Sequence, residues 1–247
     1  MDNEKRKTAL VTGASRGIGA AVAERLAREG YNLVLTCVKN IESLKSLAES
    51  LKDSYNIDCI CAAVDGGDFK QIEALFTDEF ILRNGLDLLV NNAGISYVGL
   101  LHEMTPEDWH RVMSVNLDSV FYYSRQAIPL MLSRNSGRII NISSVWGNVG
   151  ASMEVAYSTA KGGINTFTKA LAKELAPSGI AVNAISCGLI DTDMNACFSK
   201  EDLAAVVEEI PADRIGKPEE VADMVLRIAE APDYLTGQIV TIDGGWV

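Results

Sequence analysis

Short apolar runs alternate with longer segments of helical periodicity along almost the whole chain. Runs of strand length lie at 8–12, 33–35, 58–64, 86–90, 139–142, 180–186 and 238–242. Helical spacing of apolar positions fills 17–29, 40–53, 68–83, 105–133, 155–176 and a segment from about 218, with a loop expected from 187 to about 216. This alternation predicts a doubly wound α/β fold with about seven parallel strands and helices on both faces.

The first strand is followed at once by a glycine-rich turn. Gly13-Ala-Ser15-Arg16-Gly17-Ile18-Gly19 stands between this strand and the first helical segment. Glycines allow a backbone to approach a pyrophosphate closely, and a helix N-terminus offers unpaired N–H groups and positive potential. The turn is therefore a candidate phosphate site.

Other polar or glycine positions follow the predicted strands in the same way. Asp65, Asn91, Ser144 and Gly188 each stand at the carboxyl end of one strand. Ligands of open α/β sheets bind outside that edge. We therefore expect these residues to share one site with the glycine turn. No linker or repeat interrupts the alternation, so we expect a single domain over residues 1–247.

Tyr157 and Lys161 are spaced four residues apart in the helical segment that starts at Val155. Residues i and i+4 of a helix share one face, so the phenol and the ammonium are expected side by side. An ammonium at about 4 Å favours the phenolate by up to ~4 kcal/mol in an effective dielectric of about 20. A phenol tuned in this way can give a proton to a carbonyl oxygen or take one from an alcohol.

Composition removes several function classes. The net charge of −11 argues against nucleic acid or an anionic membrane as partner. No apolar run reaches membrane-spanning length, and the polar residues 1–7 are not typical of a signal peptide. Five scattered cysteines and two histidines match no disulfide framework and no metal motif. We expect a cytoplasmic protein without a metal.

Five ordered motifs resemble the short-chain dehydrogenase/reductase family over essentially the whole chain. They are TGASRGIG at 12–19, NNAG at 91–94, Asn116 with Ser144, the Tyr157/Lys161 pair, and TGQIVTIDGG at 236–245. The resemblance implies a Rossmann fold, a homotetramer formed partly through the 155–176 helix, and hydride transfer between a nicotinamide and a carbonyl or alcohol.

The resemblance also implies a role for each matched residue. Tyr157 would donate the proton, and Ser144 would orient the substrate oxygen. Lys161 would lower the tyrosine pKa and hold the nicotinamide ribose, while Asn116 would anchor a water that relays protons to Lys161. The implied cofactor-binding residues are Gly13, Ser15, Arg16, Gly17, Ile18, Gly19, Lys39, Asp65 (to the adenine amine), Asn92, Ala93, Gly94, Tyr157, Lys161, Gly188, Ile190 and Thr192.

The residues after the second strand bear on which nicotinamide is bound. NAD-dependent enzymes typically carry an acidic residue there, whereas this chain has Thr36-Cys-Val-Lys39-Asn. Arg16 and Lys39 could instead pair with a 2′-phosphate, which favours NADPH. Cys187 stands where relatives usually have proline, either as a tolerated small residue or as a redox-sensitive thiol.

Two substrates and one non-catalytic role remain open. The chain is most similar to bacterial 3-oxoacyl-[acyl-carrier-protein] reductases, but the positions of their carrier-docking arginines hold Asn135 and Ser178. The stretch 144–163 also resembles reductases of an aminopentanone group on a lysine of elongation factor P. Trp146 and Glu154 are candidate substrate contacts, and Glu154 could pair with an ammonium or cap the helix start. An NADP-binding regulatory protein without turnover is the third possibility.

Overall fold

A computed structural model describes residues 6–247, apart from the side chains of residues 196, 197 and 200. One sheet of seven parallel strands runs through it in the order β3-β2-β1-β4-β5-β6-β7. The strands are β1 (Thr8–Val11), β2 (Asn32–Cys37), β3 (Cys59–Ala63), β4 (Leu88–Asn91), β5 (Gly137–Ser144), β6 (Ile180–Cys187) and β7 (Ile239–Ile242). The predicted doubly wound architecture is confirmed.

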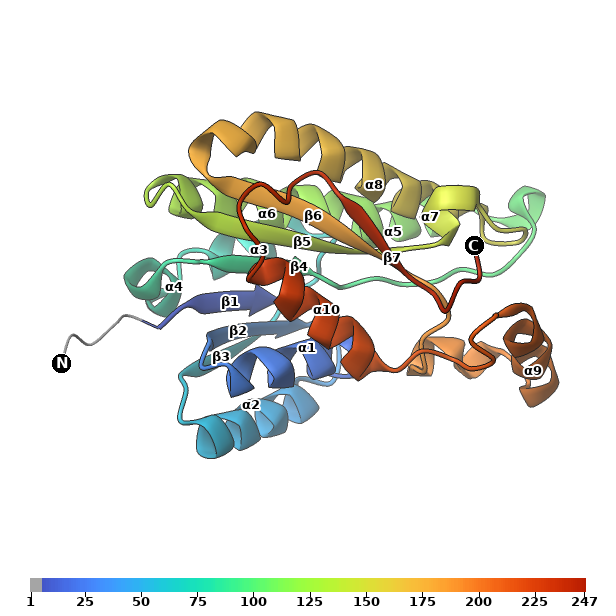
Figure 1. Cartoon of the computed structure of the whole chain (residues 1–247), viewed down its shortest axis with the longest axis horizontal. Helices are drawn as coiled ribbons and strands as arrows, with labels where there is room; N and C mark the ends of the chain where they lie inside the picture. Colours follow the sequence, from blue (N-terminus) through green and yellow to red (C-terminus); the bar gives the residue numbers. More distant parts are fainter. Residues whose placement is uncertain (1–5) are drawn as a thin grey trace.

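Helices cover both faces of the sheet (Figure 1). The connections are α1 (Gly17–Arg28), α2 (Ile41–Tyr55), α3 (Phe69–Leu75), α4 (Glu79–Asn84), α5 (Pro106–Met113), α6 (Ser119–Leu132), α7 (Trp146–Val149), α8 (Val155–Leu175), α9 (Lys200–Glu209) and α10 (Pro218–Ala229). Short 3₁₀ turns lie at Leu101–Glu103, Ala176–Ser178 and Asp193–Cys197. Helices α1, α2 and α10 pack on one face, and α5, α6 and α8 on the other.

Two apolar clusters hold these layers together. Successive residues of a strand point to opposite faces, so Val11 and Leu33 join the cluster under α1 while Leu10 and Val34 join the one under α6. Both faces of each central strand are thus buried, as expected for a parallel sheet whose strands are uniformly apolar.

Two predicted elements are wrong. The segment 68–83 is two short helices rather than one, because Asp78 interrupts it and accepts a hydrogen bond from the backbone N of Phe80 at 2.7 Å, starting α4 anew. The expected loop 187–216 contains α9. A capping box starts this helix, with Ser199 Oγ accepting from the backbone N of Asp202 and the Asp202 carboxylate accepting from the backbone N of Ser199.

The predicted helix from Thr105 to about Ser133 is continuous but not uniform. Thr105 caps α5 as expected, accepting from the backbone N of Asp108 at 3.1 Å. Between α5 and α6 the residues Ser114–Asp118 form a π-helical turn, η2, which contains Asn116. Such turns are rare and occur often at functional sites.

Candidate active site

The sheet order places the predicted site residues at one edge. Strand β1 pairs with β2 on one side and with β4 on the other. The connections on these two sides of β1 therefore cross opposite faces of the sheet. Asn91 pairs in register with Asn141, and Ser144 with Cys187. The carboxyl ends of β1, β4, β5 and β6 thus meet where the topology reverses, which is the binding crevice of open α/β sheets.

The glycine turn has no room for side chains. A Cβ on Gly13, whose φ is +66°, would lie 2.9 Å from Ala93 Cα, and one on Gly19 would lie 2.3 Å from the Gly13 carbonyl oxygen. Gly17 begins α1 with φ +54°. Glycine at Gly13 and Gly19 thus lets the turn pack closely against Ala93 and its own backbone, directly before the first N–H groups of the twelve-residue α1. These residues fit the pyrophosphate of a nicotinamide dinucleotide.

Hydrogen bonds fix the NNAG turn against the glycine turn. Thr12 Oγ1 accepts from the backbone N of Asn92 and of Ala93, each at 2.9 Å. The Asn92 amide donates in return to the carbonyl of Thr12 at 2.9 Å and of Gly13 at 3.2 Å. The first two strand ends of the site are therefore held in one rigid arrangement.

Asn116 and Lys161 meet around Gly94. A Cβ on Gly94 would lie 2.7 Å from Asn116 Oδ1 and 3.7 Å from Lys161 Nζ. Asn116 is fully buried, and its amide group bonds the backbone N and O of Ile95 at 3.0 and 2.9 Å and the Val112 carbonyl at 3.0 Å. The π-helical turn thus directs the side chain of Asn116, a poor helix former, toward the loop after β4.

The Ser144 hydroxyl lies close enough to the Tyr157 phenol to lower its pKa. The buried Ser144 ends β5, and the partly buried Tyr157 lies in the first turn of α8. Burial raises the pKa of the Tyr157 phenol well above its usual value, Glu154 and Cys187 add to the rise, and only Ser144 opposes it. The expected lowering by Lys161 is therefore wrong for the protein alone, because desolvation of the phenolate dominates.

Lys161 points past the phenol. Its Nζ donates to the Ile142 carbonyl at 2.8 Å and lies 5.5 Å from the centre of the Tyr157 ring. Burial lowers the pKa of Lys161 to about 8, since the ammonium loses its hydration and gains no carboxylate partner. The predicted pair does share one helix face, but the two polar ends make their hydrogen bonds to different partners.

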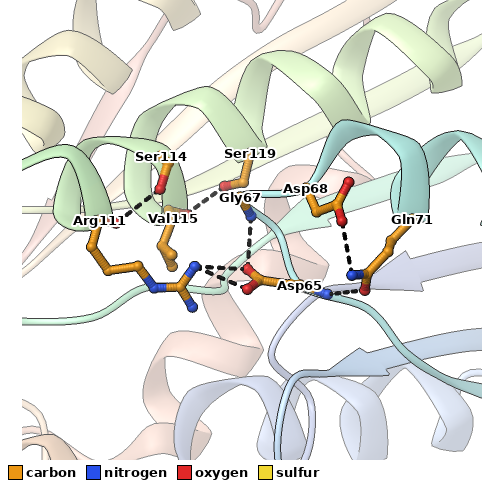
Figure 2. Close-up of polar contacts among 8 residues, drawn as sticks. All are labelled: Asp65, Gly67, Asp68, Gln71, Arg111, Ser114, Val115 and Ser119. Atoms are coloured by element: carbon orange, nitrogen blue, oxygen red, sulfur yellow. Dashed lines mark hydrogen bonds and ion pairs between the residues drawn. The ribbon is translucent and has the colours of Figure 1, made fainter. Parts of the chain in front are cut away.

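Figure 2 shows that Asp65, expected to bind an adenine amine, already has partners in the protein. Its carboxylate accepts from Arg111 at 2.9 and 3.1 Å and from the backbone N of Gly67 at 2.9 Å. The Gly67 turn packs against Ser114, where η2 begins. Sequence reasoning missed Arg111, because only the fold brings α5 beside the end of β3.

Arg16 and Lys39, the residues expected to bind a 2′-phosphate, lie in and near the glycine turn. The backbone N of Ala14 donates to the Thr36 carbonyl at 2.9 Å, which ties the turn to the end of β2 and so brings it toward the exposed Lys39. Arg16 instead forms an exposed ion pair with Asp193 at 3.0 Å. A Cβ on Gly17 would lie 3.3 Å from Thr192 Cγ2, so the segment after β6 that also includes Ile190 packs against the glycine turn.

Comparison with known proteins agrees with this arrangement. The family model for short chain dehydrogenases matches residues 7–203. The chain belongs to the short-chain dehydrogenase family. It is an oxidoreductase that acts on a CH–OH or C=O group.

Several members of the short-chain dehydrogenase family are similar over nearly the whole chain. A 3-oxoacyl-[acyl-carrier-protein] reductase of Aquifex aeolicus is 41% identical, with 97% of this chain and 96% of the relative covered. The uncharacterized oxidoreductase YmfI of Bacillus subtilis is 38% identical, covering 97% and 98%. Among solved structures, a putative gluconate dehydrogenase from Agrobacterium tumefaciens is 36% identical with a TM-score of 0.91, covering 97% and 95%.

Cys187 ends β6, in register with Ser144 at the end of β5. Its thiol is buried beside Lys161, and burial raises its pKa to about 12 although Lys161 acts in the opposite direction. Thiolates, not thiols, are the reactive form of cysteine. The structure therefore favours a small structural residue over a redox-sensitive one.

The Glu154 side chain lies between Ser96 and Trp146, just before α8. Its carboxylate accepts a hydrogen bond from Ser96 Oγ at 3.4 Å and lies close enough to Trp146 for that side chain to lower its pKa, and it makes no capping hydrogen bond to α8. Burial raises the pKa of this half-buried carboxyl group. Glu154 is the N-cap residue of α8, as one interpretation expected, but its side chain makes no capping hydrogen bond. Ser96 is a contact that the sequence did not indicate.

Residues 6–247 contain neither a membrane-spanning helix nor a cluster of metal ligands. Within them, every helix is too short or too polar to cross a membrane. The same part of the chain brings together no group of three or more histidine, cysteine, aspartate or glutamate residues able to hold a metal ion.

Proposed function

We propose that this chain is an NADPH-dependent carbonyl reductase similar to 3-oxoacyl-[acyl-carrier-protein] reductases. The observation that carries the proposal is the proximity of Ser144 and Tyr157, beside the buried Lys161 and at the same sheet edge as the glycine turn. A bound nicotinamide would supply the hydride that reduces the carbonyl carbon. The similarity to the Aquifex aeolicus reductase supports an acyl-carrier-bound ketone as substrate.

The protein residues then have separable tasks. Ser144 Oγ holds the carbonyl oxygen, and Tyr157 delivers its phenolic proton to that oxygen as the alcohol forms. The phenol is protonated at neutral pH and is therefore in the form that donates, although the raised pKa makes it a weaker acid than a free phenol. Lys161, Asn116 and the backbone around Gly94 supply polar groups on the other side of the phenol, where the proton can be replaced.

The test is nicotinamide oxidation with a panel of acetoacetyl thioesters and amino-ketones, each assayed with NADPH and NADH. We expect oxidation of NADPH with at least one acetoacetyl thioester. An NADP-binding protein without catalytic function would oxidise neither nucleotide with any activated ketone, and that result would overturn the proposal.

The nucleotide preference gives a sharper prediction. Arg16→Ala with Lys39→Ala is expected to raise the Michaelis constant for NADPH at least about 10-fold and to leave that for NADH nearly unchanged, because a charge-assisted contact to phosphate contributes roughly 1.5–3 kcal/mol. The exposed Arg16–Asp193 pair is worth only about 0–1 kcal/mol, so a phosphate can displace Asp193.

Two further variants serve as controls for this prediction. Arg28→Ala with Lys173→Ala removes the same charge elsewhere and is expected to change neither constant. Asp193→Asn frees Arg16 and is expected to lower the NADPH constant by up to about fivefold. A wild-type preference for NADH, or equal rises of both constants in the first variant, would contradict the role assigned to Arg16 and Lys39.

A second substrate, the 5-aminopentanone group on a lysine of elongation factor P, is favoured by one specific observation. Glu154 is a half-buried carboxylate one helical turn from Tyr157, and the side chains that act on it among the described residues, Ser96 and Trp146, are both neutral. A desolvated carboxylate without a cation is costly, and a substrate ammonium would relieve that cost.

Glu154→Gln separates the two substrates. We expect it to weaken reduction of an amino-ketone roughly 10-fold, about 1.4 kcal/mol, and to leave a neutral acetoacetyl thioester unaffected. Equal losses on both substrates would assign Glu154 a structural task. If the wild-type enzyme does not reduce amino-ketones, the acyl-carrier-bound ketone remains as the proposed substrate.

The assembly state is part of the same proposal. We infer a homotetramer formed partly through α8, and the exposed apolar side chains Phe121 on α6 and Val155 on α8 support a contact there. Light scattering should give the mass of four chains, and Phe121→Glu should reduce it.

A further inference from the structure

Two indole rings meet beside the catalytic residues. Trp146 follows Ser144 by two residues and begins α7, whereas Trp246 lies beyond the end of β7. Their ring centres are 4.8 Å apart and their planes are inclined by 65°, an edge-to-face contact between two partly buried side chains.

The backbone around Trp246 is held firmly. The Asp243 carboxylate accepts from the backbone N of Gly245 and of Val247, each at 2.9 Å. The Gly244 carbonyl accepts from the backbone N of Ala212 at 3.0 Å, just beyond α9. Gly244 and Gly245 have φ of +72° and +84°, the left-handed region that glycine tolerates. These contacts turn the segment so that the Trp246 ring reaches Trp146.

The two rings connect three parts of the site. Trp146 lies close enough to Glu154 to lower the pKa of its carboxyl group, and the Glu154 charge acts on the Tyr157 phenol. Trp246 Nε1 donates to Glu209 Oε2 at 3.4 Å, at the last residue of α9. Figure 1 shows α9 standing apart from the sheet on the side where the C-terminal end and α7 also lie. The two tryptophans therefore reach from the start of α8 to the end of α9.

We infer that Trp246, together with Trp146, forms one wall of the ketone-binding site and determines which substituent the ketone can carry. The inference rests on the proposed carbonyl reductase function. A carbonyl oxygen held by Ser144 and Tyr157 directs one substituent toward Trp146 and Glu154. A large and rigid indole behind Trp146 limits the size of that substituent.

The experiment compares two ketones that differ only in this substituent, ethyl acetoacetate with a methyl group and ethyl benzoylacetate with a phenyl group. Trp246→Ala is expected to raise the ratio of kcat/KM for the phenyl ketone over that for the methyl ketone at least about 10-fold. Trp246→Phe keeps an aromatic ring and is expected to change the ratio less than about threefold. Tyr234→Ala, which truncates an aromatic side chain that is 99% exposed, is the matched control and should leave the ratio unchanged.

Contact between the rings adds a second criterion. Trp146→Ala should raise the same ratio, and the double variant should exceed the larger single effect by less than about threefold, because residues in contact do not act additively. An unchanged ratio in Trp246→Ala, or equal losses on both ketones, overturns the inference while the proposed function stands. A wild-type protein that reduces neither ketone with NADPH or NADH overturns both.

Discussion

Tyr157→Phe is expected to lower the turnover of ketone reduction by at least about 100-fold while NADPH binds with nearly wild-type affinity. The substitution removes one hydroxyl group and keeps the ring. In the proposed reaction that hydroxyl lies close to Ser144 and gives its proton to the carbonyl oxygen, which a phenyl ring cannot do. Steady-state turnover and a fluorescence titration with NADPH measure the two effects separately.

A second tyrosine gives the matched control. Tyr123 is buried in the core, and its hydroxyl makes only a long contact to Thr36 at 3.4 Å. Tyr123→Phe is expected to change turnover less than about threefold. Near-normal turnover in Tyr157→Phe, or an equal loss in both variants, would remove Tyr157 as proton donor.

The architecture could be predicted from sequence because each central strand is buried on both faces. Such strands are short continuous apolar runs, and the helices between them are longer and periodic. Predicted strands such as 8–12 and 180–186 differ from β1 and β6 by a single residue at one end. The glycine turn was predictable for a related reason, since its position between strand and helix is local in the sequence.

Elements with little apolar periodicity were not predictable by the same signal. Helix α9 buries few of its residues, and its start is marked only by the Ser199–Asp202 capping box. The interruption at Asp78 likewise depends on one side chain that caps a new helix. Local polar contacts of this kind leave no trace in a pattern of apolar positions.

Within the site, sequence indicated which residues gather but not how they interact. Spacing placed Tyr157 and Lys161 on one helix face, yet burial rather than the neighbouring charge sets the tyrosine pKa. Arg111 and Trp246 were missed because their partners, Asp65 and Trp146, lie far away in the chain. Desolvation and long-range contacts depend on the assembled fold.

Lys161→Ala is expected to reduce turnover at least about 100-fold and also to weaken NADPH binding, because it removes a cation that is buried beside the phenol. Lys169→Ala is the matched control, since Lys169 lies two turns further along α8 and is exposed. We expect it to change neither quantity. Equal effects of the two variants would show that any loss comes from α8 rather than from the buried ammonium.

The same lysine predicts how reduction depends on pH. Burial lowers the pKa of Lys161 to about 8 from 10.5, so the ammonium is present below pH 8 and lost above it. The Tyr157 pKa is raised, so the phenol keeps its proton across the same range and does not cause a loss. Turnover of the wild type should therefore fall as the pH rises through about 8, and the residual turnover of Lys161→Ala should show no such fall. A fall at the same pH in both proteins would mean that another group titrates, and the charge of Lys161 would then have no part in proton delivery.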